Sequence, residues 1–320
     1  MSAGPAAVGH SVLVADVTAE DRAAWLEARR GGIGGSDAAA IVGLSPWQSA
    51  YSLWCDKVYG AADSGESEAM RWGRLLEDPV ADEYAVRTGY EVTKFAGIVA
   101  HPDHPFMYAN PDRVVRDGDT EALLEVKTTS AYNAGEWSET DAPAQYLVQV
   151  QHYLAVCGLP WCDLAVLLGG QTFHSLRVFA DGELIGWLID REAAFWELVD
   201  RRTPPPVDGH EMTTAALKAL YGTAVDIEIG LPATAGAVLA ERAHVAGEIK
   251  TLTGRKNALD NQLREWLGEA TVGVIDGRVA VTWKPVAGRV DTKALREAHP
   301  DIAAQFTGSS TRRLDVKASR

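Results

Sequence analysis

Three shortages limit what this 320-residue chain can be. Cysteine is scarce, and Cys55, Cys157 and Cys162 are too few for a disulfide framework or for a four-cysteine zinc or iron–sulfur site. No apolar run approaches the ~20 residues that a bilayer span needs. The first ten residues, MSAGPAAVGH, lack the basic start and the apolar stretch of a signal peptide. We therefore expect a cytoplasmic protein with no membrane partner.

Positive charge is also in short supply. The chain has 30 Lys and Arg against 44 Asp and Glu, a net charge of −14, which at first argues against a nucleic-acid partner. The distribution weakens that argument, because residues 231–320 carry 14 basic against 10 acidic residues and residues 1–230 carry 16 against 34. Clustered carboxylates in the first part could be metal ligands. Overall charge alone does not decide the partner.

Hydrophobic residues are plentiful, at 47%, and their spacing predicts alternating helices and strands. A spacing of three and four predicts helices over 20–30, 38–42, 49–58, 70–88, 144–156 and 181–202. A period of two predicts strands over 98–101, 106–109, 112–115, 121–128, 163–168 and 172–179. Pro79 removes one helical hydrogen-bond donor, so either a new helix starts near Asp78 or the helix kinks beside Glu77.

The proline run Thr203–Pro206 predicts a stiff linker and divides the chain into domains 1–203 and 204–320. In the second domain, apolar residues follow alternating steps of four and three over residues 238–266, with Arg242 and Lys256 at two of the positions. This pattern is typical of a coiled-coil seam, which would pack within the chain or against another copy. A hairpin is expected after it, with a turn at Asp276-Gly277.

Residues 112–127 carry the pattern that bears most directly on chemistry, a predicted β-hairpin. Side chains alternate between the two faces of a strand, so Leu123, Glu125 and Lys127 point one way. The residues between them point the other way. One face of the second strand therefore presents a carboxylate next to an ammonium group.

The turn of this hairpin decides what lies opposite Glu125. With a two-residue turn at Gly118-Asp119, Asp112 faces Glu125 directly, with Cβ atoms ~5 Å apart. With the turn one residue earlier, Asp112 lies diagonal to Glu125. Both registers place Asp112 on the same face as Glu125 and Lys127.

Two carboxylates at that spacing repel each other unless a cation lies between them. Oxygen ligands favour Mg²⁺, with Mn²⁺ as a substitute, over zinc. Such a metal lowers the pKa of bound water and stabilises charge on a phosphate, and Lys127 could orient or deprotonate the water. A carboxylate pair on an exposed hairpin with a lysine ion pair explains the same residues equally well.

The order of motifs along residues 20–200 resembles that of the PD-(D/E)xK nuclease superfamily. Within it, the chain is most similar to the viral recombinase group called YqaJ, related to the phage lambda exonuclease. The motifs are Trp25 with Arg29, Gly34-Gly35-Ser36-Asp37, Arg71-Trp72-Gly73 before Glu77, Asn110-Pro111-Asp112, Glu125-Val126-Lys127-Thr128, and Gln149-Val150-Gln151-His152-Tyr153. The resemblance implies a mixed, mostly antiparallel α/β sheet flanked by helices, with a small C-terminal helix-plus-hairpin region.

The resemblance also implies a role for each site residue. Asp112, Glu125 and the backbone carbonyl of Val126 would bind the metal. Glu77 would bind a second metal or a metal-bound water. Lys127 would position the nucleophilic water, and Gln149 would complete the site from its rim. From the residues alone, Glu77 could equally be a solvated helix residue and Gln149 part of an ordinary polar face.

The glycine-rich segment Gly31–Ser36 invites comparison with phosphate-binding loops. It lacks the third glycine of a dinucleotide fingerprint and the Gly-Lys-Ser/Thr of a Walker loop. What remains is a bend before a helix that Ser36 can cap, or simply a tight turn. A helix N-terminus attracts anions. In the nucleases that the chain resembles, this region holds a 5′-phosphate, which Arg29 would pair with and Ser36 would hydrogen bond.

The resemblance implies a metal-dependent DNA exonuclease that works from the 5′ end of linear duplex DNA and leaves a 3′ single strand for recombination. Its partners would be double-stranded DNA ends and a single-strand annealing protein in a bacterial cell, and ring-shaped homo-oligomers occur among the relatives. One alternative is an endonuclease or a repair nuclease of the same superfamily, although the cysteine count argues against an iron–sulfur cluster. The other is a non-catalytic DNA-binding or assembly module, against which the intact Asp112, Glu125 and Lys127 argue.

Overall fold

The computed structural model describes residues 8–15, 22–60, 65, 67–95, 97–308 and 312–316. The chain forms two compact units, one up to Leu220 and one from Tyr221 onward. Each unit is described by itself. Among the described residues, no helix combines the length and the apolar character needed to cross a membrane.

The first unit is built around a five-stranded sheet with the order β2-β5-β6-β7-β8. Its strands are β2 (Glu91–Lys94), β5 (Arg113–Asp117), β6 (Thr120–Thr129), β7 (Trp161–Leu168) and β8 (Thr172–Phe179). Strands β6 and β7 run parallel, and the other neighbours are antiparallel. The predicted mixed, mostly antiparallel sheet is confirmed.

A smaller sheet has the order β1-β3-β4. Its strands are β1 (Val12–Ala15), β3 (Ile98–Ala100) and β4 (Tyr108–Ala109). Strands β1 and β2 were not expected from the sequence. Both are four residues long and largely exposed, so pairing with β3 and β5 defines them and no buried face marks them in the sequence.

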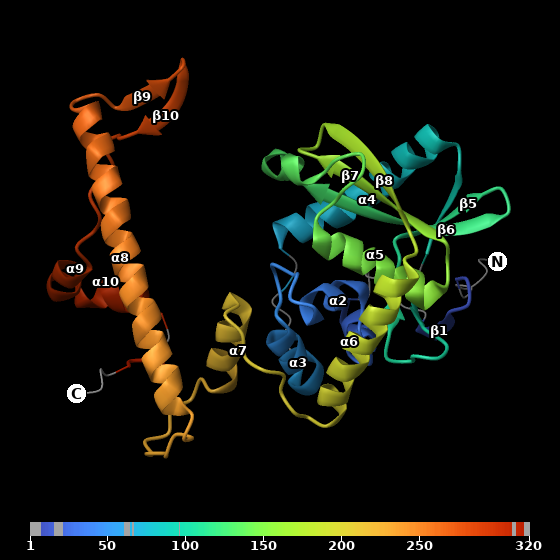
Figure 1. Ribbon diagram of the computed structural model, residues 1–320, viewed down its shortest axis with the longest axis horizontal. Coiled ribbons are helices and arrows are strands. Elements are labelled where there is room, and N and C mark those ends of the chain that lie inside the picture. The colour runs from blue at the N-terminus through green and yellow to red at the C-terminus, as the bar shows by residue number, and fades with distance from the viewer. Residues whose placement is uncertain are drawn as a thin grey trace. The chain divides into compact units, whose positions relative to one another are not determined.

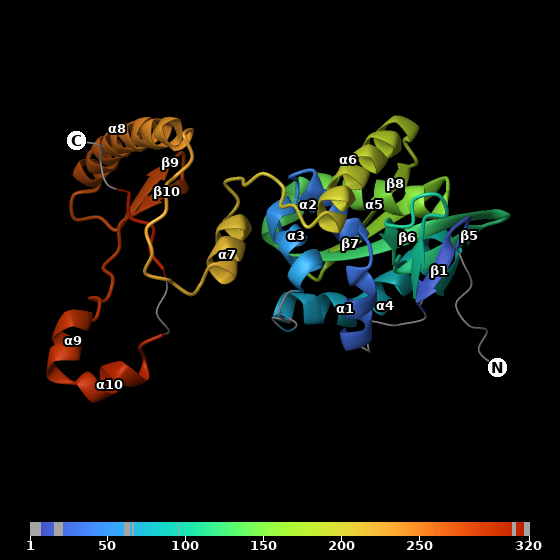
Figure 2. The same cartoon turned by 90° about the horizontal axis from the view of Figure 1, so that it is seen from below.

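Helices cover both faces of the five-stranded sheet, as Figures 1 and 2 show. The helices of this unit are α1 (Arg22–Arg30), α2 (Gly35–Ile41), α3 (Ala50–Tyr59), α4 (Glu68–Thr88), the 3₁₀ helix η1 (Ala131–Glu136), α5 (Ala144–Cys157), α6 (Gly182–Asp200) and α7 (Glu211–Leu220). Helix α4 runs through Pro79 without a break, so the expectation of a new helix near Asp78 is wrong.

Strand β6 shows how the two faces are used. Leu124 and Val126 pack in one apolar cluster with Tyr84 of α4. Leu123 packs in another with Leu154 of α5. The predicted alternation is therefore confirmed, and the face of β6 that holds Leu123 is the one covered by α5.

Helix α7 belongs to the first unit, although the predicted boundary at Thr203–Pro206 would place it in the second. Thr213 of α7 is buried, and its hydroxyl lies 2.7 Å from the hydroxyl of Ser49. Ser49 is itself the N-cap of α3. This buried contact joins α7 to α3, so the chain returns to the first unit after the proline run.

The second unit contains α8 (Ala235–Leu267), β9 (Val272–Ile275), β10 (Arg278–Thr282), α9 (Thr292–Ala298) and α10 (Pro300–Gln305). Strands β9 and β10 form the predicted antiparallel hairpin. None of the described residues from 221 onward is buried. The apolar side chains of the predicted seam on α8 are all exposed in the single chain: Val238, Val245, Ile249, Leu252, Leu259, Leu263 and Trp266.

Candidate active site

The β5–β6 hairpin sets the geometry of the site. Arg113 pairs with Leu124 and Asp117 with Thr120, which leaves Gly118-Asp119 as a two-residue turn. Gly118 has a φ of +59°, a left-handed conformation that glycine adopts without strain. Of the two registers considered, this is the one that continues to Asp112 opposite Glu125.

Asp112 and Glu125 meet at the start of this hairpin, and both carboxylates are largely enclosed. Asp112 accepts a hydrogen bond from the backbone N–H of Val126 at 2.8 Å. Glu125 is 3% exposed, and its Oε1 accepts hydrogen bonds from Lys127 Nζ at 2.5 Å and Gln149 Nε2 at 2.6 Å. The structure thus brings together Asp112, Glu125, Lys127 and Gln149, four of the five side chains predicted to act.

The charges in this cluster act on one another. Burial, with the neighbouring carboxylates of Glu125 and Glu77, raises the pKa of Asp112 well above its usual range. Burial alone would lower the pKa of Lys127, but Glu125 and Asp112 outweigh it and raise that pKa. Lys127 therefore keeps its proton beside the carboxylates and donates a hydrogen bond to Glu125.

Glu77 lies at the edge of this cluster, on α4. Its Oε1 is 2.5 Å from Nη1 of Arg113, a buried arginine of β5 that also pairs with Asp78. Nη1 of Arg113 donates in addition to the backbone carbonyl of Asp112, at 2.6 Å. The structure therefore gives Glu77 an arginine partner, and its predicted place as a ligand of a second metal stays a prediction.

The donor set at the hairpin suits a small divalent cation. One oxygen of Glu125, Oε2, is buried and has no hydrogen-bond partner. Among the described residues, no three His, Cys, Asp or Glu side chains gather into a metal-binding group, so Asp112 and Glu125 would hold a cation as a pair. Mg²⁺ is commonly bound by one or two carboxylates, with water and substrate phosphate completing its octahedron. Val126, whose backbone N–H donates to Asp112, stays the predicted source of a backbone oxygen.

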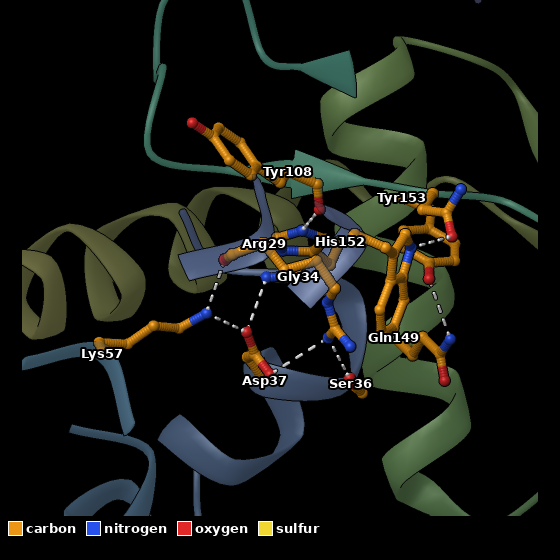
Figure 3. A network of polar contacts seen from close by, with 11 residues as sticks. Arg29, Gly34, Ser36, Asp37, Lys57, Tyr108, Gln149, His152 and Tyr153 are labelled. Atoms are coloured by element: carbon orange, nitrogen blue, oxygen red, sulfur yellow. Dashed lines mark hydrogen bonds and ion pairs between the residues drawn. The ribbon is translucent and has the colours of Figure 1, made fainter. Parts of the chain in front are cut away.

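Gln149 connects this cluster to a second one. Its Nε2 lies 3.2 Å from the hydroxyl of Tyr153, one turn further along α5. Tyr153 lines a cavity of about 80 Å³ together with Trp25, Arg29, Gly34, Ser36 and Asn110. Figure 3 shows Gln149 and Tyr153 of α5 beside Arg29 and Ser36, and the hydrogen bond from Gln149 to Glu125 connects these residues to the carboxylate cluster.

Arg29 and Ser36 meet in this cavity. Nη2 of Arg29 donates to Oγ of Ser36 at 3.0 Å, and the guanidinium lies 4.5 Å from the centre of the Trp25 ring. Gly35 permits the close approach of α2 to α5, because a Cβ there would come within 2.5 Å of the Tyr153 ring. The structure places Arg29 and Ser36 together at one small cavity, and their contact with a 5′-phosphate stays a prediction.

Ser36 does not cap α2, contrary to expectation. The N-cap is Gly34, and the carboxylate of Asp37 accepts the hydrogen bond of the Gly34 N–H at 3.0 Å. Ser36 lies inside the first turn of the helix, where Arg29 engages its hydroxyl. Asp37 can reach back to Gly34 because it is the third residue of the helix, the position from which a carboxylate closes a capping box.

A buried ion pair between Lys57 and Asp37 lies next to this cavity. Lys57 of α3 donates to Asp37 at 2.8 Å and to the carbonyl of Arg29 at 3.0 Å (Figure 3). Burial alone would raise the pKa of Asp37, but Lys57 and Arg29 outweigh it and lower the pKa to about 2. Asp37 therefore stays ionised and holds Arg29 in place.

A second buried pair fixes α5 against its neighbours. His152 lies 2.9 Å from Glu192 of α6 through Nδ1 and 2.8 Å from the carbonyl oxygen of Tyr108 through Nε2. Both partners accept, so both ring nitrogens donate when the imidazole is protonated. Burial opposes that form, but Glu192 outweighs it and raises the pKa of His152. The pair ties α5, α6 and β4 together beside the cavity.

Three residues near the site were not predicted from the sequence: Lys57, Arg113 and Tyr146. The ring centre of Tyr146 lies 5.1 Å from Lys127 Nζ. One signal was present for Arg113. It sits one residue after Asp112, so alternation turns its side chain toward the opposite, buried face, where a cation needs a carboxylate partner. Lys57 and Tyr146 carry no comparable local signal.

Comparison with known proteins identifies the family. Residues 24–160 match the YqaJ-like viral recombinase domain. The chain is also 38% identical over 284 residues to the uncharacterized protein YqaJ of Bacillus subtilis strain 168, which covers 87% of this chain and 88% of that protein. The chain therefore belongs to the YqaJ-like viral recombinase family, and the resemblance drawn from the motifs is confirmed.

Solved structures with a similar fold include two exonucleases. The alkaline exonuclease LHK-Exo of Laribacter hongkongensis has a TM-score of 0.47 and 24% identity, covering 62% of this chain and 98% of that one. A phage-related exonuclease of Haemophilus somnus 129PT has a TM-score of 0.43 and 13% identity, covering 53% of this chain and 94% of that one.

Proposed function

We propose that this protein is a metal-dependent DNA exonuclease that degrades linear duplex DNA from its 5′ ends and leaves 3′ single strands for recombination. The observation that carries the proposal is the juxtaposition of Asp112, Glu125 and Lys127 on the β5–β6 hairpin, where one buried oxygen of Glu125 has no hydrogen-bond partner. Membership of a viral recombinase family supports the same conclusion.

The chain's own residues would divide the work as follows. Asp112 and Glu125 would hold Mg²⁺ or Mn²⁺, which lowers the pKa of water and neutralises charge on the phosphate. Lys127, which keeps its proton, would orient the attacking water by donating a hydrogen bond. Gln149 would keep the Glu125 carboxylate from rotating, since its amide donates to Oε1.

End recognition would come from Arg29 and Ser36. A guanidinium is a strong phosphate donor, and here it is backed by Asp37 and lines the same cavity as Ser36. A 5′-phosphate bound in that cavity would lie next to the carboxylate cluster, because Gln149 contacts both Glu125 and Tyr153. This arrangement favours cutting near an end over cutting inside a duplex.

The proposal is tested with three DNAs and Mg²⁺: a linear duplex with a 5′-phosphate, the same duplex with a 5′-hydroxyl, and a closed circle. We expect the 5′-phosphorylated duplex to be degraded fastest and the circle to stay intact. Lys127→Ala should lower the rate by about 100-fold or more. Arg29→Ala should remove the preference for a 5′-phosphate while leaving Mg²⁺-dependent cutting.

Each other result selects another function. Cutting of the circle would keep the nuclease and discard end recognition, which is the endonuclease alternative. DNA binding without any cutting, by folded protein in Mg²⁺ and in Mn²⁺, would favour a DNA-binding module that retains the fold.

The proposed partners follow from this role. DNA ends would be the substrate, a single-strand annealing protein would receive the 3′ strand, and the reaction would take place in the cytoplasm of a bacterial cell.

We also propose that a second copy of this chain covers the seam on α8. The seam repeats every three and four residues along the 33 residues of α8 and is exposed in the single chain, and a second copy would present the same repeat.

A further inference from the structure

A second, larger cavity adjoins the catalytic hairpin and has no part in the proposed chemistry. Its volume is about 610 Å³. Thr128 and Thr129, which directly follow Lys127 on β6, form part of its wall. The remaining wall comes from the loop before α3, from η1 and from the first turn of α5. We refer to it as the aromatic cleft.

Three aromatic rings give the cleft its character. Tyr146 is central, with the Trp137 ring stacked 5.5 Å away and the Trp47 ring 6.1 Å away on a tilted plane, centre to centre. Trp137 is 8% exposed, so core packing explains it. Trp47 is 61% exposed, and no core packing accounts for it. Tyr146 also lies against Lys127, so the three rings extend from Trp47 to the lysine of the proposed active site.

The polar groups that line the cleft suit the bases of a nucleic acid better than its phosphates. Of the eleven described residues that line it, none is Lys or Arg, and Glu136 is acidic. The cleft therefore disfavours phosphate. Asn133, Gln145 and the two threonines offer neutral donors and acceptors, the groups that read base edges. Rings with an exposed face and neutral amides together suit a flat, uncharged heterocycle.

We propose that the aromatic cleft binds unstacked nucleobases of the strand that is cut, by stacking on Trp47 and Tyr146. The inference rests on the proposed DNA substrate. The inference requires the strand to separate from its complement where its phosphodiester reaches Asp112 and Glu125, and the separated bases then need new stacking partners. Aromatic side chains provide these for any base, so the cleft would hold the strand without selecting a sequence.

The test compares two 5′-phosphorylated duplexes that each carry two unpaired 5′ nucleotides, one with bases and one abasic at those positions. Binding is measured by fluorescence anisotropy, both in EDTA and with Ca²⁺ in place of Mg²⁺. Wild-type protein should bind the DNA with bases more tightly. Trp47→Ala should weaken that binding by about 5- to 100-fold and leave abasic binding unchanged. Trp47→Phe should retain most of the affinity.

Trp187 provides the control, because it is an exposed tryptophan, at 42%, that does not line the cleft. Trp187→Ala should bind both DNAs as the wild type does, and thermal unfolding should show both alanine variants folded. Equal binding of the two DNAs by the wild type, no binding of either, or equal losses on both DNAs in Trp47→Ala would each overturn the inference. Base-dependent binding without any cutting would keep the cleft and remove the proposed nuclease, so the two failures are distinguishable.

Discussion

The two units of this chain treat their apolar and charged residues in opposite ways. The first unit encloses a core on both faces of a sheet and buries ionisable pairs in it, such as Asp37 with Lys57 and His152 with Glu192. The second leaves the apolar seam of a 33-residue helix exposed. The first unit buries its own apolar side chains, whereas an exposed seam of this length calls for a partner.

The similarity to Bacillus subtilis YqaJ extends into both units. The match to Bacillus subtilis YqaJ covers 87% of this chain, which is more than the first 220 residues contain. Part of the second unit is therefore shared with that protein.

The largest effect on folding is expected at the buried pair of the first unit. Asp37→Asn removes the carboxylate that neutralises Lys57, whose side chain is 3% exposed, and leaves a buried cation without a partner. We expect the free energy of unfolding to fall by about 3–5 kcal/mol at pH 7. Chemical denaturation followed by circular dichroism measures this.

Asp82→Asn is the matched control, because it makes the same change at an exposed position of α4. It should change the stability far less. If Asp37→Asn were as mild as this control, the first unit would not depend on its buried charges and the contrast between the units would fail.

A smaller effect is expected from the seam of the second unit. Leu252→Glu places a charge in the middle of the exposed seam while keeping a residue that favours helix. If α8 pairs with a second copy, dissociation should become easier by about 2–4 kcal/mol, the usual cost of losing a buried leucine. Sedimentation equilibrium of the full-length protein measures it.

Ala258→Glu adds the same charge to α8 away from the seam and should leave the association unchanged. A wild-type protein that stays monomeric at all concentrations would contradict the proposed pairing of α8.

The smallest effect concerns acid. The pKa of Asp37 is lowered from 3.8 to about 2, so its ionised form stabilises the folded state fully above pH 3.8. That stabilisation is lost as the pH falls through about 2, and it amounts to about 2 kcal/mol. The stability difference between wild type and Asp37→Asn should therefore shrink by about this amount between pH 5 and pH 2. A difference that stays constant with pH would show that Asp37 is not held ionised by Lys57 and Arg29.

Local rules predicted much of the catalytic hairpin. Alternation along β6 fixed which face holds Glu125 and Lys127, and only two turns needed consideration to place Asp112. Both depend on residues close together in the sequence. The structure keeps the register with the Gly118-Asp119 turn.

Local rules did not predict the contacts between segments that are distant in the sequence. Lys57 reaches Asp37 from another helix, and Arg113 engages Glu77 across 36 residues. Ser36 was expected as a cap because serine is a common capping residue, but Asp37 and Gly34 close the first turn of α2 instead. Tertiary packing decided these positions, and one sequence does not encode it locally.

The most direct test of the account is the rate at which wild type and Glu125→Gln degrade 5′-phosphorylated linear duplex DNA as Mg²⁺ is raised. Glutamine keeps the size of Glu125 but removes its negative charge. The unpartnered carboxylate oxygen proposed to hold the metal is thereby lost. We predict that the wild type degrades the DNA in proportion to bound Mg²⁺ and that the folded variant is at least about 100-fold slower at every concentration. Equal rates for the two proteins would contradict catalysis at this hairpin.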